Sequence, residues 1–389
     1  MANLFDLFGG HFMSDVPNPY PVYARLRSDE PVKFLDLAMM SAYLTTRFED
    51  VMTVLRDAAV YSSRANAKGI GLVMGKTILE MDGQEHARHR NIISMAFVPK
   101  ALRGDVPDVV ERIAHDMIDR FAHAGRADLV SQFTLTFPLR VIAHVIGVPI
   151  EDYETFKRWS LELIGFAADP ARGFAAATNL VDYLRPIVER RRAAPCGDLL
   201  STLTHAEVDG DRLTDEEIYS FLRLLLPAGS DTTYRLIGSA LFALLTHPEQ
   251  LEAVRADRSK IAALLDETLR WEAPVQFASR EANTDTTLGG VDVPAGAQVL
   301  VALGSANRDE RRFDNPDRFD IHRRVDEHVA FGFGRHFCLG SHLARLEATT
   351  ALNALLDRLP NLRLDAPPEC AIVGLAFRSP NRLPVRFDA

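Results

Sequence analysis

Hydrophobic residues recur at helical spacing along most of the 389-residue chain, and this periodicity predicts a mainly α protein. We expect helices over residues 101–124, 151–165, 174–192, 214–246 and 338–358. Shorter stretches near the two ends alternate apolar and polar residues, which is typical of strands. They predict a strand over 41–48, a hairpin over 288–303 that turns at Pro294 and Gly296, and a β pair over 375–387. The predicted fold class is therefore α+β, mainly α with small β-sheets.

The helix predicted over residues 214–246 is the longest of the set. Its start is marked by Thr214-Asp-Glu-Glu217, which has the pattern of a capping box, and no stop signal follows until His247-Pro248. A helix of about 32 residues is ~48 Å long. Because the segments FLRLLL and LIGSALFALL make most of its faces apolar, we expect it to cross the centre of the protein.

The composition is that of a globular protein. Hydrophobic residues make up 47% and charged residues 25% of the chain, which excludes a disordered protein. No Gly/Ser-rich linker or charge block divides the sequence, so we predict a single domain over residues 1–389. The formal net charge of -9 argues against nucleic-acid binding, because neutralising phosphates requires clustered positive charge.

The three cysteines, Cys196, Cys338 and Cys370, have no CxxC spacing, which suits neither a disulfide framework nor a zinc site. They predict a reducing compartment. The N-terminal residues show no basic segment followed by an apolar one, and no stretch reaches the ~20 apolar residues of a membrane span. We therefore expect a cytoplasmic protein that has no membrane segment.

Candidate chemistry is concentrated at residues 331–340, which read FGFGRHFCLG and lead directly into a helical pattern. A cysteine just before a helix can be held as a thiolate, because backbone N–H groups and the positive helix end stabilise the sulfur anion. Gly332, Gly334 and Gly340 would let the backbone approach a flat ligand closely. The alternative for Cys338 is a small buried hydrophobic residue.

Two further patterns lie inside predicted helices. Glu267 and Arg270 share one helix face before Pro274 and can form an ion pair, although most such pairs are solvated surface contacts. In the longest helix, the run PAGSDTT over 227–233 disfavours regular helix, so we expect the helix to open or kink there. The alternative is a kink whose polar residues face a satisfied core.

The run 331–340 matches the pattern Phe-x-x-Gly-x-x-x-Cys-x-Gly without departure, and so resembles the heme-binding loop of the cytochrome P450 family. Further similarities to the family, from PNPYPVYARLR to GLAFRSPNRLPVRF, cover nearly the whole chain. The resemblance implies a single-domain P450 fold with heme b, iron protoporphyrin IX, between the long central helix and the helix after the cysteine loop. Cys338 would be the metal ligand, and the loop's other heme-binding residues would be Phe331, Gly332, Gly334, His336 and Gly340.

The run 227–233 resembles the oxygen-binding motif of the same family. The resemblance places Ala228 and Gly229 over the heme, and it makes Asp231 and Thr232 the catalytic acid and hydroxyl of a proton relay. Pro227 is less usual at its place in this motif.

The resemblance also assigns charged residues elsewhere in the chain. The heme propionates would be held by His86, Arg90, Arg280 and His336, each of which alone would be an ordinary solvated side chain. His86 and Arg90 are four residues apart and so face the same way on a helix. Arg318, in the stretch NPDRF, would join Glu267 and Arg270 in a buried structural triad.

The activity implied by the resemblance is that of a heme-thiolate monooxygenase, which inserts one oxygen atom from O2 into a hydrophobic small molecule by hydroxylation or epoxidation. The chain has no strand-borne GxGxxG, so we expect electrons to come from another protein. The resemblance implies a ferredoxin or flavodoxin with its NAD(P)H-dependent reductase, and Arg335 is a candidate docking residue. Two alternatives stay open. One is a peroxide-dependent peroxygenase, which generally lacks the acid and hydroxyl pair, and the other is a non-catalytic heme sensor or carrier.

The segments that the family uses to line its substrate pocket are almost entirely apolar in this chain, namely 69–75, the helices around 155–185, 275–278 and 373–377. They predict a hydrophobic ligand such as a terpenoid, steroid, fatty acyl or aromatic compound. An apolar wall discriminates weakly among these classes, so the sequence leaves the substrate open.

Overall fold

The structure is a computed structural model that describes residues 7, 8, 15–37, 40–94, 97, 104–149, 152–208, 210–325, 327–365 and 370–389. Its helices are α2 (Tyr20–Asp29), α3 (Phe48–Arg56), α4 (Gly71–Met74), α5 (Gly83–Ser94), α6 (Val106–Ile118), α7 (Phe137–Ile146), α8 (Tyr153–Ile164), α9 (Pro170–Ala193), α10 (Leu199–His205), α11 (Asp215–Thr246), α12 (Pro248–Ala256), α13 (Ile261–Trp271), α14 (Leu303–Ala306) and α15 (Ser341–Arg358). Each of the predicted helical stretches corresponds to one of these helices, namely α6, α8, α9, α11 or α15, and α9 extends beyond the predicted 174–192 at both ends.

The strands are short. They are β1 (Val32–Leu37), β2 (Met40–Thr45), β3 (Tyr61–Ser62), β4 (Arg126–Asp128), β5 (Glu207–Val208), β6 (Asp211–Arg212), β7 (Phe277–Ala282), β8 (Thr286–Leu288), β9 (Val291–Val293), β10 (Gln298–Ala302), β11 (Arg363–Leu364), β12 (Ile372–Val373), β13 (Ser379–Pro380) and β14 (Pro384–Arg386). The prediction of a mainly α fold with small sheets is confirmed.

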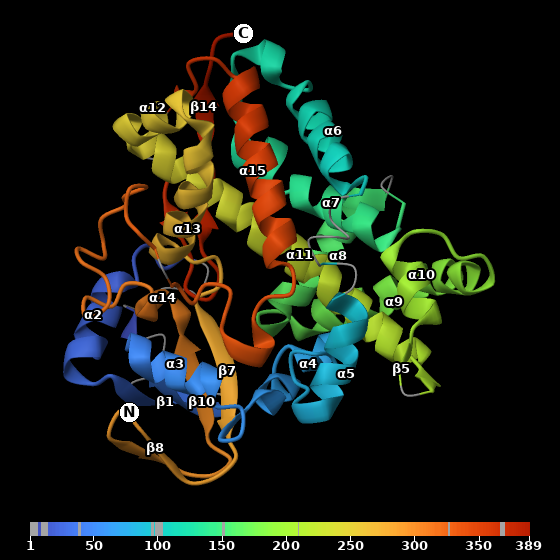
Figure 1. Ribbon diagram of the computed structural model, residues 1–389, viewed down its shortest axis with the longest axis vertical. Helices are drawn as coiled ribbons and strands as arrows, with labels where there is room; N and C mark the ends of the chain where they lie inside the picture. Colours follow the sequence, from blue (N-terminus) through green and yellow to red (C-terminus); the bar gives the residue numbers. More distant parts are fainter. Residues whose placement is uncertain are drawn as a thin grey trace.

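Figure 1 shows a part rich in strands and a part made of helices. The helices α2, α3 and α14 lie with β1, β7 and β10 at the lower left, whereas α6 to α10 gather at the right. The helix α11 runs through the centre, where α7, α8, α13 and α15 pack against it. Most of its residues are buried, which confirms the predicted central helix.

The start of α11 is fixed by the predicted capping box. The Thr214 hydroxyl accepts a hydrogen bond from the Glu217 N–H at 3.3 Å, and the Glu217 carboxylate accepts one from the Thr214 N–H at 2.7 Å. This reciprocal arrangement satisfies two backbone donors that the helix itself leaves without partners.

The predicted opening of α11 at residues 227–233 does not interrupt the helix, which is continuous from Asp215 to Thr246. Pro227 removes one backbone donor. The hydroxyl of Ser230 donates to the Leu226 carbonyl at 2.7 Å, and that of Thr232 donates to the Ala228 carbonyl at 2.8 Å. These bonds stay within the helix, and packing by the surrounding helices holds a turn that local preferences disfavour.

The largest sheet has the strand order β1-β2-β10-β7-β3. β2 confirms the strand predicted over 41–48, although it ends at Thr45 and Phe48 already begins α3. The hairpin predicted over 288–303 is wrong in its pairing. Its turn lies at Gly289 and Gly290, which join β8 to β9, while β10 pairs parallel with β2 and antiparallel with β7. Both glycines have positive φ, 55° and 82°, which suits them to a tight turn.

The pair of strands predicted over 375–387 is also wrong in its partners. β13 pairs with β12, whereas β14 pairs with β11 and β4. The segment Arg126–Asp128 that forms β4 is far away in the sequence, so the pairing is decided by tertiary contacts that local alternation cannot report.

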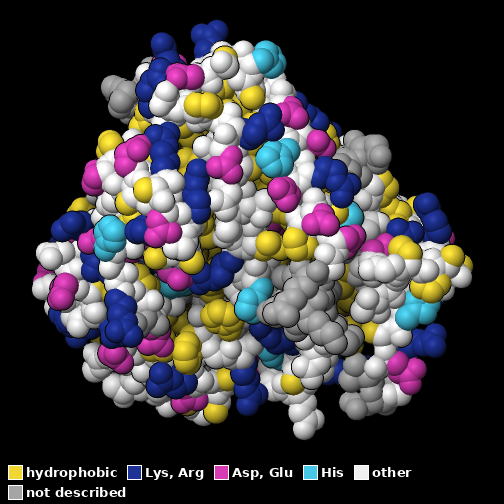
Figure 2. Space-filling view, turned by 45° about the horizontal axis from the view of Figure 1, so that its top comes forward, with side chains coloured by type: hydrophobic (Ala, Val, Ile, Leu, Met, Phe, Trp, Pro, Cys, Tyr) yellow, Lys and Arg dark blue, Asp and Glu magenta, His cyan; other side chains and the backbone are white. Residues whose placement is uncertain are grey.

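Lys and Arg side chains are interspersed with Asp and Glu over the face of the molecule shown in Figure 2. This face therefore lacks a continuous area of one charge sign. None of the described helices combines the length and the apolar character that crossing a lipid bilayer requires.

Candidate active site

Cys338 lies at the N-terminal end of α15, at the end of a loop that folds back on itself. Its own N–H donates to the Phe331 carbonyl at 2.8 Å, which closes the loop 331–338. The backbone N–H groups of Gly340 and Ser341 are directed at its sulfur. The structure thus places the thiol where a helix end stabilises negative charge.

Burial raises the pKa of the Cys338 thiol, while the two backbone N–H groups and the Arg90 guanidinium act to lower it. Arg90 is positioned by its own hydrogen bond, in which Nη2 donates to the Phe337 carbonyl at 2.6 Å. Burial outweighs these groups, so the pKa of the thiol is raised overall. A metal ion bound to the sulfur would act in the opposite direction.

Two glycines give the cysteine loop its shape. Gly332 and Gly334 both have φ near the left-handed region, at 70°, where a side chain is strained. At Gly334 a Cβ atom would also lie 3.0 Å from the Leu55 carbonyl oxygen. The ring of Phe331 meets that of Phe337 edge to face at 6.1 Å, so the loop is packed as well as bent.

Four nitrogen-bearing side chains gather beside this loop. His86 and Arg90 come from α5, Arg280 from β7 and His336 from the loop itself. The rings of His86 and His336 are 4.2 Å apart between centroids. The Nε2 atom of His336 also lies 2.9 Å from the Ser63 hydroxyl, a neighbour that the sequence did not indicate.

The positive charge of this group is carried by Arg90 and Arg280, and a nearby carboxylate, that of Asp82, has its Oδ1 atom 3.7 Å from His336 Nε2. Burial lowers the pKa of His336 to about 3, and the charges of Arg280, His86 and Arg90 act in the same direction. Burial and Arg90 also lower the pKa of His86, whose buried Nε2 has no hydrogen-bond partner in the described part of the chain. Arg280 is buried and donates to the Ser279 carbonyl at 2.8 Å. It forms no ion pair with a described carboxylate, although the charge of Asp82 acts against burial to raise its pKa. Such a cluster favours an anionic ligand.

In the middle of α11, Thr232 and Asp231 point in different directions. The Thr232 hydroxyl donates to the Ala228 carbonyl of the preceding turn, and the side chains of Thr232 and Ala228 are at least partly exposed. Gly229 faces α7, where a Cβ atom would lie 2.8 Å from Ile142 Cγ1, so close packing of α7 on α11 requires glycine here. A bulkier residue would push the two helices apart.

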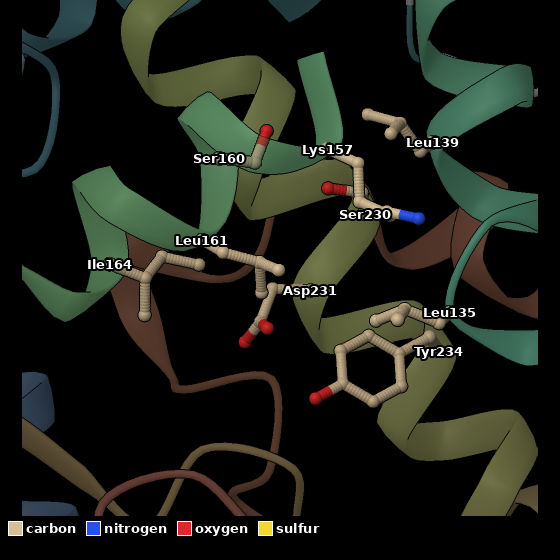
Figure 3. Close-up of a pocket in the computed structure, with 9 residues that line it drawn as sticks. All are labelled: Leu135, Leu139, Lys157, Ser160, Leu161, Ile164, Ser230, Asp231 and Tyr234. Carbon is tan, nitrogen blue, oxygen red and sulfur yellow. The ribbon is translucent and has the colours of Figure 1, made fainter. Parts of the chain in front are cut away.

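Asp231 is buried and its two carboxylate oxygens are both engaged by Arg235. Nε donates to Oδ2 at 2.9 Å and Nη2 donates to Oδ1 at 3.0 Å. Figure 3 shows the carboxylate beside a small cavity of about 10 Å³ between α11 and α8, lined by Leu161, Ile164, Ser230 and Tyr234 among others. Sequence reasoning missed Arg235, although its spacing of four residues from Asp231 was a usable signal.

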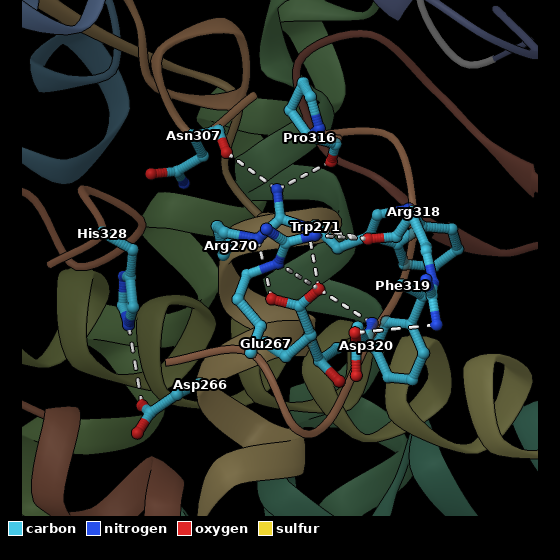
Figure 4. A network of polar contacts seen from close by, with 12 residues as sticks. Asp266, Glu267, Arg270, Trp271, Asn307, Pro316, Arg318, Phe319, Asp320 and His328 are labelled. Carbon is cyan, nitrogen blue, oxygen red and sulfur yellow. Dashed lines mark hydrogen bonds and ion pairs between the residues drawn. The ribbon is translucent and has the colours of Figure 1, made fainter. Parts of the chain in front are cut away.

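Glu267 and Arg270, from α13, form an ion pair in which neither side chain is exposed. Figure 4 shows Arg270 reaching the backbone carbonyls of Asn307, Pro316 and Arg318, while Glu267 accepts from the Asp320 N–H at 3.0 Å. The pair is buried rather than solvated, because backbone groups satisfy its remaining donors and acceptors.

The prediction that Arg318 completes this triad is wrong. Its side chain is 71% exposed and lies 3.8 Å from Asp320, and only its backbone carbonyl takes part in the network. The third cation is Arg323, whose Nε lies 3.3 Å from Glu267 Oε1. Arg323 is fixed in turn by the carbonyls of Asp314, Asn315 and Arg318, so the path of this irregular segment selects the arginine.

Comparisons with known proteins agree with this fold and loop. The family model described as Cytochrome P450 matches residues 155–369. The chain is 36% identical to "Cytochrome P450 107B1" of Saccharopolyspora erythraea over 384 residues, with 94% of each chain covered. It is also 36% identical to "Cytochrome P450 monooxygenase PikC" of Streptomyces venezuelae over 370 residues, covering 92% of this chain and 88% of the relative.

Solved structures give the same result. Cytochrome P450 CYP109Q5 from Chondromyces apiculatus superimposes with a TM-score of 0.88 at 38% identity, covering 96% of each chain. CYP109E1 from Bacillus megaterium in complex with testosterone gives 0.86 at 32% identity, covering 96% of this chain and all of the other. P450BioI, in complex with an acyl carrier protein that bears hexadec-9Z-enoic acid, gives 0.88 at 34% identity over 95% and 99% of the two chains.

Fold and relatives together define a heme-thiolate monooxygenase, as the sequence predicted. The chain belongs to the cytochrome P450 family.

The side chains of the site fit the heme that the family implies. Its two propionates are anions, and among the described residues the structure offers them Arg280, which has no ion-pair partner there, and the Nε2 atom of His86, which has no hydrogen-bond partner there. Its iron is a cation, and the structure offers it the Cys338 sulfur with two N–H groups already directed at it. Both ends of the ligand therefore meet the opposite charge.

Proposed function

We propose that Cys338 is the axial thiolate of a heme b group in this chain. The observation that carries the proposal is the sulfur at the N-terminal end of α15, with two backbone N–H groups directed at it, beside the buried Arg280, which forms no ion pair with a described carboxylate. His86, Arg90, Arg280 and His336 would hold the propionates. Phe331, Gly332, Gly334 and Gly340 would shape the thiolate side, and Ala228 and Gly229 the opposite side.

When it is bound, a thiolate-ligated heme activates O2, since electron donation from sulfur favours cleavage of the O–O bond. The chain's own part is to supply protons and to hold the substrate. Thr232 is suited to this task, because its hydroxyl oxygen can accept a hydrogen bond while its proton rests on the Ala228 carbonyl. Asp231 would supply protons from the small cavity beside α8.

The substrate that we propose is a hydrophobic small molecule, oxidised by hydroxylation or epoxidation. The expected pocket segments 69–75, 275–278 and 373–377 are almost entirely apolar, and Val275 pairs with Phe377 so that two of them lie side by side. A steroid lies in the structure of CYP109E1, and an acyl chain in that of P450BioI. A steroid or a fatty acyl compound is therefore a suitable first probe.

Electrons would come from a ferredoxin or flavodoxin with an NAD(P)H-dependent reductase. A groove of about 490 Å³ lies beside the cysteine loop, lined by Phe331, Phe333, Phe337 and Arg345 together with Asp266 and Glu327. Aromatic side chains together with charged groups are typical of protein docking surfaces. Arg335, in the same loop, remains a candidate contact. A cytoplasmic location is proposed with it, because Cys196, Cys338 and Cys370 are all unpaired.

The first test is the spectrum of the reduced, carbon monoxide-bound protein. A band near ~450 nm is expected from thiolate ligation. Cys338→Ala should abolish the band, while the matched control Cys370→Ala should retain it. A band in the Cys338→Ala protein, or none in the parent protein, would remove the assignment.

The second test measures turnover. With a [2Fe–2S] ferredoxin, its reductase and NADPH, we expect testosterone or hexadec-9Z-enoic acid to shift the spin state of the iron and to gain one oxygen atom. Product formed with hydrogen peroxide alone would instead favour the peroxygenase. Ligand binding without consumption of NADPH would favour a sensor or carrier.

A further inference from the structure

The acid of the proposed relay is held by a neighbour on its own helix. Asp231 is 3% exposed and Arg235 is 14% exposed, and two hydrogen bonds join them side on. This bidentate geometry fixes both the position and the plane of the carboxylate. Because the pair is removed from water, the loss of either partner would leave the other as an uncompensated buried charge.

Arg235 is itself fixed from outside the helix. Its Nη1 donates to the Ser379 hydroxyl at 3.2 Å, so the guanidinium ties α11 to the C-terminal strand β13. The rings of Tyr234 and Phe377 lie 4.8 and 5.4 Å from the guanidinium carbon. Burial lowers the pKa of Arg235, but the charge of Asp231 outweighs burial and raises it, so the arginine stays charged. A cation held by two rings and a hydroxyl is a rigid support.

This support keeps the acid apart from the hydroxyl that it has to serve. Thr232 is the next residue, yet its hydroxyl donates to the Ala228 carbonyl, and both oxygens of Asp231 are occupied by Arg235. No hydrogen bond joins Asp231 to Thr232 in the described part of the chain. A proton can pass between them only through water or after one oxygen of Asp231 leaves the guanidinium.

We propose that Arg235 is a positioning residue that holds Asp231 in the one orientation from which protons reach the oxygen-binding site, with Ser379 as its anchor. The inference rests on the proposed function, because it assigns Arg235 a task within the same proton relay. Removing the guanidinium would leave a buried carboxylate free to turn away, so the proton-dependent step would slow while heme binding would not change.

The chemistry can be followed without knowing the substrate. In the absence of substrate, O2 takes up two electrons and two protons to leave as hydrogen peroxide, or four electrons and four protons to leave as two molecules of water. Only the second path breaks the O–O bond, and it needs the relay. The ratio of NADPH consumed to O2 consumed is therefore about one for peroxide and about two for water, by the electron count of each path.

The experiment compares Arg235→Gln, Arg235→Lys and Ser379→Ala in the heme-loaded protein, driven by a ferredoxin, its reductase and NADPH. We expect Arg235→Gln to lower the rate of water formation about tenfold and to enlarge the rate ratio between H2O and D2O. Arg235→Lys keeps the charge without the bidentate contact and should restore part of the rate. Ser379→Ala should act weakly in the same direction. Arg255→Gln, which breaks the pair with Glu252 on α12, is the matched control and should equal the parent protein.

The double variant Asp231→Asn with Arg235→Gln separates positioning from a general loss of structure. If Arg235 acts through Asp231, the double variant forms water at the same rate as Asp231→Asn alone, because the two effects are not additive. The inference would be overturned if the losses of the two single variants added up in the double variant. It would also be overturned if Arg235→Gln and Arg235→Lys formed water at the rate of the parent protein and with its isotope ratio. If the parent protein lacks the band near ~450 nm, the proposed function itself fails. The variants at Arg235 and Ser379 are expected to keep this band, so the two kinds of failure can be distinguished.

Discussion

Glu267 and Arg270 meet through two hydrogen bonds, from Nε to Oε2 at 2.7 Å and from Nη2 to Oε1 at 2.8 Å, with both side chains completely buried. Arg323 adds a third contact to the same carboxylate at 3.3 Å. Burying full charges is tolerable only when each has partners, so removal of one member leaves the others uncompensated.

Loss of Glu267 is therefore expected to be severe. We predict that Glu267→Gln lowers the free energy of unfolding by about 3–5 kcal/mol, as breaking a buried ion pair does. Unfolding by guanidinium chloride, followed by circular dichroism, measures the change.

A comparison of Arg323 with Arg318 tests which arginine is the third member of the buried network. Arg323→Ala should destabilise the protein, whereas Arg318→Ala should alter the free energy of unfolding by no more than ~0.5 kcal/mol, because the Arg318 side chain is on the surface. The reverse order would show that Arg318 is the third member after all.

Two substitutions separate the shape of the Thr232 side chain from the chemistry of its hydroxyl. Thr232→Val keeps the branched shape and removes the hydroxyl, so we expect the heme spectrum to stay and the share of electrons released as hydrogen peroxide to rise severalfold. Thr232→Ser keeps the hydroxyl and should behave like the parent protein. Equal peroxide release from the two variants would exclude the hydroxyl from the relay.

The heme-free protein should lose stability as the pH falls. The pKa of His336 is about 3 in the folded chain and ~6.5 in an unfolded one. Between these values the unfolded chain binds more protons, so the stabilisation present above pH ~6.5 is lost progressively toward pH ~3, by up to ~1.4 kcal/mol per pH unit. His336→Gln should flatten this slope, and heme should flatten it too, because its propionates favour the charged histidine. An unchanged slope in both cases would contradict the assignment.

The cysteines should differ sharply in reactivity. Cys196 is exposed, whereas Cys370 is buried and its pKa is raised to about 11, by burial first and by Asp128 second. Because the thiolate is the reactive form, we predict that iodoacetamide at pH 8 labels Cys196 in the native heme-loaded protein and reaches Cys370 only after unfolding. Peptide mass spectrometry identifies the labelled residue, and Cys196→Ser should leave the native protein unlabelled.

Features carried by neighbouring residues could be predicted from the sequence. The capping box at Thr214, the central helix, the helix after Cys338 and the pairing of Glu267 with Arg270 all depend on residues within a few positions of one another. Hydrophobic periodicity and fixed spacing report such features directly, because they determine which side chains share a face. The cysteine loop belongs here as well, since its glycines and its helix end are local.

Features that join distant segments were decided by the tertiary structure. The strands β10, β13 and β14 pair with strands that the local alternation of residues does not predict. The turn of α11 that contains Pro227 stays helical because other helices pack around it. Arg323 replaces Arg318 at Glu267 because the backbone of an irregular segment turns one arginine inward and the other outward. Local sequence determined which chemical groups this protein carries, and chain folding decided which of them meet, because a contact between distant residues depends on the path of everything between them.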